Sequence, residues 1–368
     1  MLFWLVLILF TTFIPILRRE NYLLVISWVI LTLFSALRYH VGPDFIQYEY
    51  IYSTLTSGGT TAKEVGYYFI VMFSDFIGGN AQTVFIIFSI IISTFFYLFI
   101  SRSSNFFEEN SRYEYKYLML LFFIAFYYFQ SMNQIRQFAA IAVSLFALLC
   151  FVNKKILLSV ILIFFASSFH VSALLLLGLL PFMTIKMSHK ALIILLVSIA
   201  FIEPINLIKS IYIDLKLPYY GYLAYVEFAN ETSMVGRLST YISSIVIVTM
   251  LSFLNIPNKR METVFKNAIV LYITFRLMAL DFEQINRIAN YFKPFVFVMF
   301  SILVLELFNK YIYKRMALSA FFFMLLTFSS AIYIYRSSSD ISYSHYTLNY
   351  CILSDSVCPI VISENLWK

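Results

Sequence analysis

The sequence is poor in the features on which most soluble enzymes depend. Only 12% of its 368 residues are charged, and it contains 9 glycines, 8 prolines and 3 cysteines. It has neither of the phosphate-binding patterns G-x-x-x-x-G-K-[ST] and G-x-G-x-x-G, and it lacks H-E-x-x-H, G-x-S-x-G and any C-x-x-C pair. Because these motifs are missing, the energy for any reaction must come from an already activated substrate or from an ion gradient.

Hydrophobic residues dominate instead. They make up 61% of the chain, and the mean hydropathy is +0.84, which excludes a soluble domain. Apolar stretches of roughly membrane length recur from end to end, so we predict an all-α polytopic membrane protein with about 12 transmembrane helices. The expected spans are 2–17, 22–37, 81–100, 117–130, 136–152, 156–169, 171–185, 191–203, 238–255, 266–281, 288–308 and 316–335.

The positions of Lys and Arg predict the orientation. Cytoplasmic loops of membrane proteins are enriched in basic residues, and every adjacent basic pair falls on one side if both termini lie outside. This topology gives one transmembrane domain over residues 1–335, outer loops at 38–80 and 204–237, and a polar outer tail at 336–368. Residues 65–79 are too short to cross upright, so we interpret them as a re-entrant or interfacial helix.

Several ionisable residues then share the outer side. Such residues at a membrane boundary are costly and are functional candidates, although a single arginine there often only anchors a helix. The set consists of Arg38, Asp44, Glu64, Arg136, His170, Arg276, Asp281, Glu283 and Arg287.

These side chains suit a lipid pyrophosphate substrate. Guanidinium groups bind phosphate oxygens in pairs and can neutralise a leaving group, and a neighbouring carboxylate or histidine can take a proton from an attacking hydroxyl. The single pair of acidic residues spaced so that both could bind one metal ion is Asp281-Phe-Glu283. With Arg287 nearby, we interpret it as part of an ion pair and expect neither a metal nor another cofactor.

Five motifs in this order resemble the EpsG family, which is grouped with Wzy-type polymerases of O-antigen and of capsular or exopolysaccharide. They are LRYHVGPDFIQY at 37–48, Glu64-x-Gly66-Tyr67-Tyr68, NQIRQFAAIA at 133–142, FHVSALL at 169–175 and NRIANYF at 286–292. The resemblance extends to about residue 310.

This resemblance implies a glycosyltransferase C-like membrane fold and metal-independent glycosyl transfer. A glycan on undecaprenyl pyrophosphate would be moved onto a new lipid-linked repeat unit at the outer face of the bacterial inner membrane. The implied partners are that lipid-linked oligosaccharide, membrane lipid and a polysaccharide chain-length regulator protein, with no nucleic acid. The positions that match the polar motifs of the family are Arg38, Asp44, Glu64, Arg136, His170 and Arg287.

Our hypothesis for these residues divides them by role. Arg136 and Arg287 bind the donor pyrophosphate, and either Asp44 or His170 is the catalytic base. Arg38 and Glu64 shape the first loop and bind the acceptor sugar. The alternative is a flippase or exporter of the same lipid-linked oligosaccharide, which would need charged residues deep in a central cavity. A third hypothesis is a membrane O-acyltransferase, which would need its polar groups nearer the cytoplasmic side.

Overall fold

The computed structural model of the chain describes residues 7, 10–12, 15, 20–39, 41–42, 44–60, 64–106, 112–186, 234–254, 256–280, 285–310 and 349–350. These residues are mostly helical, which confirms the predicted all-α class. The expected spans 191–203 and 316–335, nearly all of the loop 204–237 and most of the tail lie outside the described residues.

Most helices begin and end close to the limits that the apolar pattern predicted. They are α2 (Asn21–Ala36), α3 (Phe45–Thr56), α4 (Val65–Phe76), α5 (Ala81–Ser104), α6 (Arg112–Phe123), the π-helical turn η2 (Ile124–Tyr128), α7 (Phe129–Asn133), α8 (Ile135–Val152), α9 (Ile156–Phe169), the 3-10 turn η3 (Val171–Leu174), α10 (Leu175–Met183), α14 (Met234–Leu251), α15 (Lys259–Met278), α16 (Asn286–Ala289) and α17 (Lys293–Lys310).

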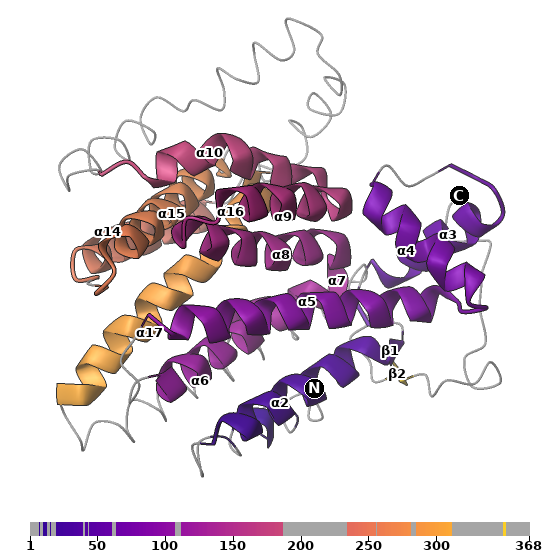
Figure 1. Cartoon of the computed structure of the whole chain (residues 1–368), viewed down its shortest axis with the longest axis horizontal. Helices are drawn as coiled ribbons and strands as arrows, with labels where there is room; N and C mark the ends of the chain where they lie inside the picture. Colours follow the sequence, from indigo (N-terminus) through magenta and orange to yellow (C-terminus); the bar gives the residue numbers. More distant parts are fainter. Residues whose placement is uncertain are drawn as a thin grey trace, which may run out of the picture.

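Two of the described helices, α5 and α8, are long and apolar enough to cross a membrane, and five apolar segments of 10–17 residues accompany them. The expected number of about 12 spans is not reached among the residues described. Helices α2, α5, α8, α9 and α10 lie side by side in Figure 1, while α17 crosses the bundle obliquely.

Helix α8 is the centre of the bundle. All of its residues are buried except the partly exposed Arg136 and Phe146. Residues 139, 140, 142 and 147 of this helix are alanines. Such small side chains allow neighbouring membrane helices to approach closely. Helices α5 and α9 make its main contacts. A polar residue at the end of α8 is therefore surrounded by several helices at once.

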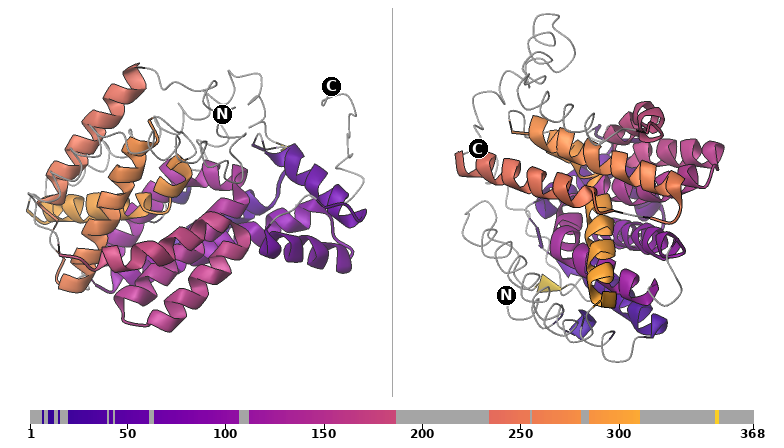
Figure 2. Two further views of the ribbon diagram at one scale, coloured as in Figure 1. Left: turned by 90° about the horizontal axis from the view of Figure 1, so that it is seen from above. Right: turned by 90° about the vertical axis from the view of Figure 1, so that its left-hand side faces the viewer.

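The region 38–80 differs from the loop that we expected, because most of it is helical. Helices α3 and α4 form a pair at one end of the bundle, beside the start of α8 (Figures 1 and 2). Helix α4 has 12 residues, which correspond to roughly 18 Å, so it is shorter than the ~30 Å apolar core of a bilayer. Its outer face carries the exposed side chains of Phe69, Phe73 and Phe76. The range 65–79 thus contains a short apolar helix, and its re-entrant or interfacial position in a membrane stays a prediction.

A short antiparallel pair of strands lies at the same end. Strand β1 (Arg38–Tyr39) pairs with β2 (Asn349–Tyr350), with Arg38 opposite Tyr350. The pairing brings these two tail residues to the C-terminal end of α2, which β1 follows (Figure 1). Cys351 and Cys358, which we expected in an outer tail, lie outside the described residues.

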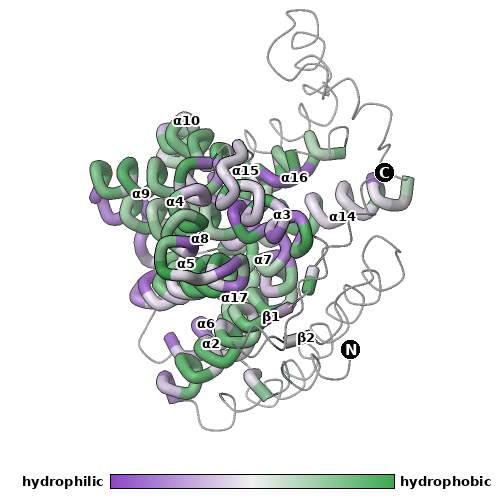
Figure 3. The backbone as a smooth tube through the Cα atoms, turned by 90° about the vertical axis from the view of Figure 1, so that its right-hand side faces the viewer, coloured by the Kyte–Doolittle hydropathy of each residue, from purple (hydrophilic) through white to green (hydrophobic). Residues whose placement is uncertain are grey.

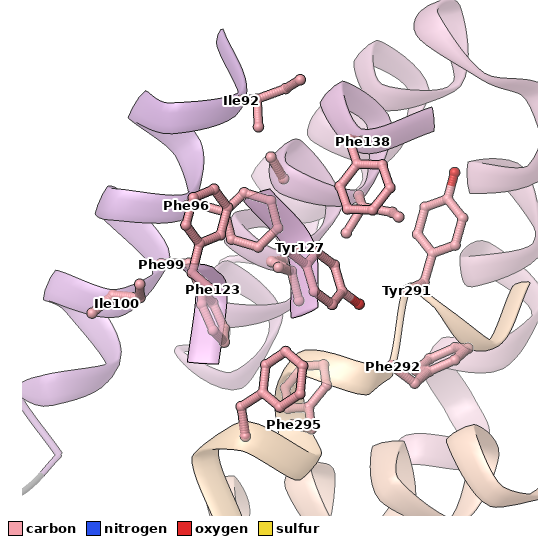
Figure 4. Packing of buried hydrophobic residues seen from close by; sticks show 14 of the residues in the cluster. Ile92, Phe96, Phe99, Ile100, Phe123, Tyr127, Phe138, Tyr291, Phe292 and Phe295 are labelled. Carbon is pink, nitrogen blue, oxygen red and sulfur yellow. The ribbon is translucent and has the colours of Figure 1, made fainter. Parts of the chain in front are cut away.

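The two ends of the bundle differ in polarity. Basic side chains gather at the end opposite α3 and α4, where Arg260 donates to the carbonyl of Phe151 at 3.1 Å and Lys116 donates to Asn21 at 3.2 Å. Figure 3 looks at the α3–α4 end and shows polar stretches in α3 and α16, whereas α9 and α10 are mostly hydrophobic. Between the two ends the interior is largely aromatic, with Tyr127 among Phe96, Phe123 and Phe138 (Figure 4).

Candidate active site

A carboxylate at the start of α4 joins three separate parts of the chain. Glu64 Oε2 accepts a hydrogen bond from Arg136 Nη1 of α8 at 2.6 Å, and Glu64 Oε1 lies 3.3 Å from His170 Nδ1 at the end of α9. The side chains are 13%, 26% and 20% exposed for Glu64, Arg136 and His170. The structure therefore gathers three of the six predicted site residues into one partly accessible cluster, which we call the Glu64 cluster.

A glycine makes this meeting possible. A Cβ atom on Gly66 would lie 2.4 Å from Ser168 Oγ and 2.9 Å from the Ser168 carbonyl oxygen. Real Cβ atoms are not found at such distances, so α4 can approach the end of α9 this closely only because residue 66 has no side chain. This contact explains the physical role of the Glu64-x-Gly66 motif, since the close approach brings Glu64 to His170.

Two tyrosines hold Arg136 from its sides. The centre of its guanidinium lies 5.6 Å from the ring centroid of Tyr48 and 5.3 Å from that of Tyr67. Both rings are buried, and cations near aromatic faces are stabilised by the ring quadrupole. Arg136 is thus fixed in direction by a carboxylate and two rings, while about a quarter of its side chain remains accessible.

Asp44 is placed by a turn that precedes α3. Gly42 has φ +97°, a left-handed conformation that favours glycine. The backbone amide of Asp44 donates to Asn133 Oδ1 at 2.8 Å. Although Asp44 occupies the N-cap position of α3, its side chain does not cap the helix. The carboxylate makes no hydrogen bond with the residues described, which leaves it available for chemistry.

Charges from two helices act on Asp44. Burial raises the pKa of the Asp44 carboxyl, although the positive charges of Arg287 and Arg136 oppose that effect. Glu64 shows the opposite result. Burial alone would raise its pKa, but the hydrogen bond with His170 and the charge of Arg136 outweigh burial and lower it. Glu64 therefore loses its proton more readily than an ordinary carboxyl, and Asp44 is protonated more readily than an ordinary carboxyl.

Arg287 belongs to a segment that is anchored at three points. Gln137 Nε2 donates to the Arg287 carbonyl at 2.8 Å, the hydroxyl of Tyr127 donates to the Asn290 carbonyl at 2.6 Å, and the hydroxyls of Ser172 and Tyr291 lie 3.0 Å apart. These bonds attach residues 286–292 to α8, η2 and η3. The expected ion pair of Arg287 with Asp281 or Glu283 falls outside the described residues.

Arg38 differs from the surface position that we expected. Its side chain is fully buried, and its guanidinium donates to the carbonyls of Ser35 and of Met132, the latter at 2.9 Å. It also lies 4.7 Å from the ring centroid of Phe85. These contacts connect α2, α5 and α7, so the geometry is that of an arginine that supports the site from inside the bundle.

The sequence reading missed several side chains that position the site. Tyr48, Tyr67, Asn133 and Gln137 lie within or next to the quoted motifs, but their partners are distant in sequence and no local pattern reveals them. Among the described residues, no three His, Cys, Asp or Glu side chains are grouped so that they could hold a metal ion.

No curated protein and no solved structure matches the chain. The model of the EpsG family matches residues 21–350, a range that contains all the site residues described above. Together with this match, the apolar helices indicate a membrane protein. Because the match covers most of the chain, the chain belongs to the EpsG family, which includes Wzy-type polymerases and transferases.

Proposed function

We propose that the protein is a polysaccharide polymerase that acts on lipid-linked repeat units, such as those of an O-antigen, at the outer face of the bacterial inner membrane. The observation that carries this proposal is the Glu64 cluster, with Asp44 under the influence of both Arg136 and Arg287 at the same end of an apolar bundle. The membership of the EpsG family supports a polymerase-like activity in polysaccharide biosynthesis.

The donor in this proposal is a glycan attached to undecaprenyl pyrophosphate. Arg136 and Arg287 bind its pyrophosphate, because guanidinium groups form paired hydrogen bonds with phosphate oxygens. Glu64 and the two tyrosine rings hold Arg136 in one orientation. A preorganised cation of this kind stabilises the charge that develops on the leaving group without any reorganisation during the reaction.

The transfer step is a displacement at the anomeric carbon of the donor sugar. An acceptor hydroxyl, at the non-reducing end of a newly arrived lipid-linked repeat unit, forms the new bond to this carbon. The bond from the carbon to the pyrophosphate oxygen breaks, and undecaprenyl pyrophosphate leaves with the electron pair. The proton of the hydroxyl passes to a base of the protein.

We propose Asp44 as that base. Its carboxylate has no hydrogen-bond partner among the described residues and is close enough to both arginines to be influenced by their charge. The raised pKa also makes it a stronger proton acceptor than an ordinary carboxylate. His170, the other candidate, has Nδ1 engaged with Glu64, so its Nε2 is left to orient the acceptor hydroxyl. Arg38 supports the site from within.

The orientation in the membrane is inferred from charge. The basic side chains of Lys116, Lys259, Arg260 and Lys266 gather at the opposite end from the Glu64 cluster. Positive residues favour the cytoplasmic side, which supports an active site that faces outward. The polar groups of the described site also cluster at one end and do not continue through the bundle, which disfavours the flippase alternative.

Deletion of the gene followed by electrophoresis of the surface polysaccharide tests the proposal. A polymerase mutant leaves one repeat unit on the lipid anchor, whereas loss of a flippase leaves none and loss of an acyltransferase leaves full-length chains that lack a substituent. Either of the last two patterns would overturn the proposed function. Complementation with wild type should restore long chains, and complementation with Asp44→Asn should not.

A further inference from the structure

A lysine that the sequence motifs do not include lies next to the segment that carries Arg287. Lys293 is the first residue of α17, directly after the anchored segment 286–292. Its Nζ is 5.3 Å from the ring centroid of Phe126, 5.4 Å from that of Tyr127 and 5.9 Å from that of Phe297. The side chain is partly exposed.

The ring arrangement around Lys293 is specific. Phe126 and Tyr127 are consecutive residues of the π-helical turn η2, and such turns occur frequently at functional sites. The rings of Phe126 and Phe297 stack with centroids 5.4 Å apart, and the ring of Tyr127 stands nearly perpendicular to that of Phe297. Figure 4 shows Tyr127 between the core phenylalanines and the segment that carries Tyr291 and Phe292.

The charge of Lys293 is not balanced by the residues described. No hydrogen-bond acceptor or carboxylate contacts its ammonium group among them, and its charged neighbour is Arg276, which has the same sign. A positive charge at the first residue of a helix also opposes the helix dipole. Cation–π contacts offset only part of the cost of removing an ammonium group from water. Three unfavourable features at one ammonium group indicate that an anion completes this site.

Lys293 is connected to Arg287 through the segment that carries both residues. Lys293 follows Arg287 by six residues, at the start of α17, and its ammonium group lies near the ring of Tyr127, whose hydroxyl binds the Asn290 carbonyl between them. The long, flexible side chains of Arg287 and Lys293 can therefore reach two linked phosphate groups of one ligand. Arg276, which is held by Asn286 Oδ1 at 2.9 Å, lies on the same side.

We propose that Lys293 is a second phosphate-binding residue, which binds one phosphate group of the lipid pyrophosphate donor while Arg136 and Arg287 bind the other. The inference rests on the proposed function, because it assumes that the donor carries a pyrophosphate. It makes Lys293 a residue that distinguishes lipid pyrophosphates from lipid monophosphates. The shared chemistry is a phosphate oxyanion, so an anionic membrane lipid is the competing occupant.

Binding measurements on the full-length protein in nanodiscs test this inference. The probes are undecaprenyl pyrophosphate and undecaprenyl monophosphate, each measured in neutral phosphatidylcholine and again with phosphatidylglycerol added. Lys293→Met keeps the length of the side chain and removes its charge. We expect the Kd for the pyrophosphate to rise about tenfold or more, as for the loss of one charged hydrogen bond, and the Kd for the monophosphate to change by much less.

Two further variants make the result specific. Lys293→Arg, which keeps the charge, should retain most of the affinity for the pyrophosphate. Lys155→Met removes an exposed lysine at the opposite end of the bundle and should leave both Kd values unchanged. Thermal unfolding of each variant shows whether it is folded at the temperature of the binding assay.

Three outcomes would overturn the inference. The first is an unchanged Kd for the pyrophosphate in a folded Lys293→Met protein. The second is an equal rise in Kd for the pyrophosphate and the monophosphate. The third is a preference of the wild-type protein for the pyrophosphate that disappears when phosphatidylglycerol is added. A wild-type protein that prefers the pyrophosphate through Lys293 but does not elongate glycans would instead refute the proposed function and leave this inference standing.

Discussion

Arg136 and Glu64 form an ion pair with 2.6 Å between Nη1 and Oε2, although 72 residues separate them in the sequence. The pair connects the end of the most buried helix with a short helix at the end of the bundle. With His170 on the other carboxylate oxygen, it fixes the direction of a cation that is still about a quarter exposed. An arginine held in this way is ready to bind an anion without first losing the freedom of its own side chain.

Replacement of either proposed pyrophosphate ligand by lysine should remove most activity. Arg136→Lys and Arg287→Lys keep the charge, but a lysine cannot present two parallel N–H donors to a phosphate. We expect the rate of polymerisation in proteoliposomes to fall roughly 100-fold, equivalent to about 2.7 kcal/mol. Near wild-type rates in folded lysine variants would show that the two arginines only anchor helices.

Addition of one methyl group at Gly66 should separate α4 from α9. The Cβ of Gly66→Ala would meet both Ser168 Oγ and the backbone carbonyl of Ser168. A carbonyl oxygen of a helix cannot move aside cheaply, so α4 must shift and the contact between Glu64 and His170 should be lost. We expect polymerisation to fall at least tenfold. Gly178→Ala in α10, which meets no atom within 4 Å, is the matched control and should be neutral or slightly stabilising.

The activity should decline in mild acid because of Asp44. Its ionised form is the proposed base, and burial raises its pKa, so protonation on acidification begins at a higher pH than for an ordinary carboxyl. An ordinary carboxyl titrates at about pH 4. The acid limb of kcat/KM should therefore lie at a higher pH than that. Glu64, with its lowered pKa, remains ionised in that window and contributes no such limb.

Two variants separate Asp44 from its neighbours in the pH profile. Burial raises the pKa of Glu49 in α3 to about 7, so Glu49→Gln removes a titration that could overlap with that of Asp44. The acid limb should persist in Glu49→Gln and in the residual activity of His170→Asn. Its disappearance in His170→Asn would identify the histidine as the base.

Chelation should not affect the reaction. The proposed charge stabilisation comes from guanidinium and ammonium groups, and no metal ligand takes part in the mechanism. We expect purified protein in proteoliposomes to retain full activity after EDTA treatment and dialysis. Loss of activity that Mg²⁺ or Mn²⁺ restores would contradict this prediction and would point to Asp281 and Glu283 as ligands.

The helical, apolar character of the chain follows from its amino-acid sequence alone. Continuous apolar runs require internally satisfied backbone hydrogen bonds, and a helix provides them within one segment. This is why the predicted spans 22–37, 81–100 and 136–152 lie close to α2, α5 and α8. The same local pattern singled out Glu64, Arg136 and His170, because each interrupts an apolar stretch or stands at its end.

Which of these residues come into contact depends on how the helices pack. A local pattern reports that a side chain is polar at a helix end, but its partner depends on how closely two helices approach, and at Gly66 this is set by a missing Cβ. Packing between distant segments also explains two differences from the predictions. Helix α3 forms in a region that we expected to be a loop, and Arg38 lies inside the bundle. No local pattern reveals the surroundings of Lys293, because its ring partners come from η2 and α17. Phe126 and Lys293 are more than 160 residues apart in the sequence. Packing between distant helices thus decides which polar groups share a site.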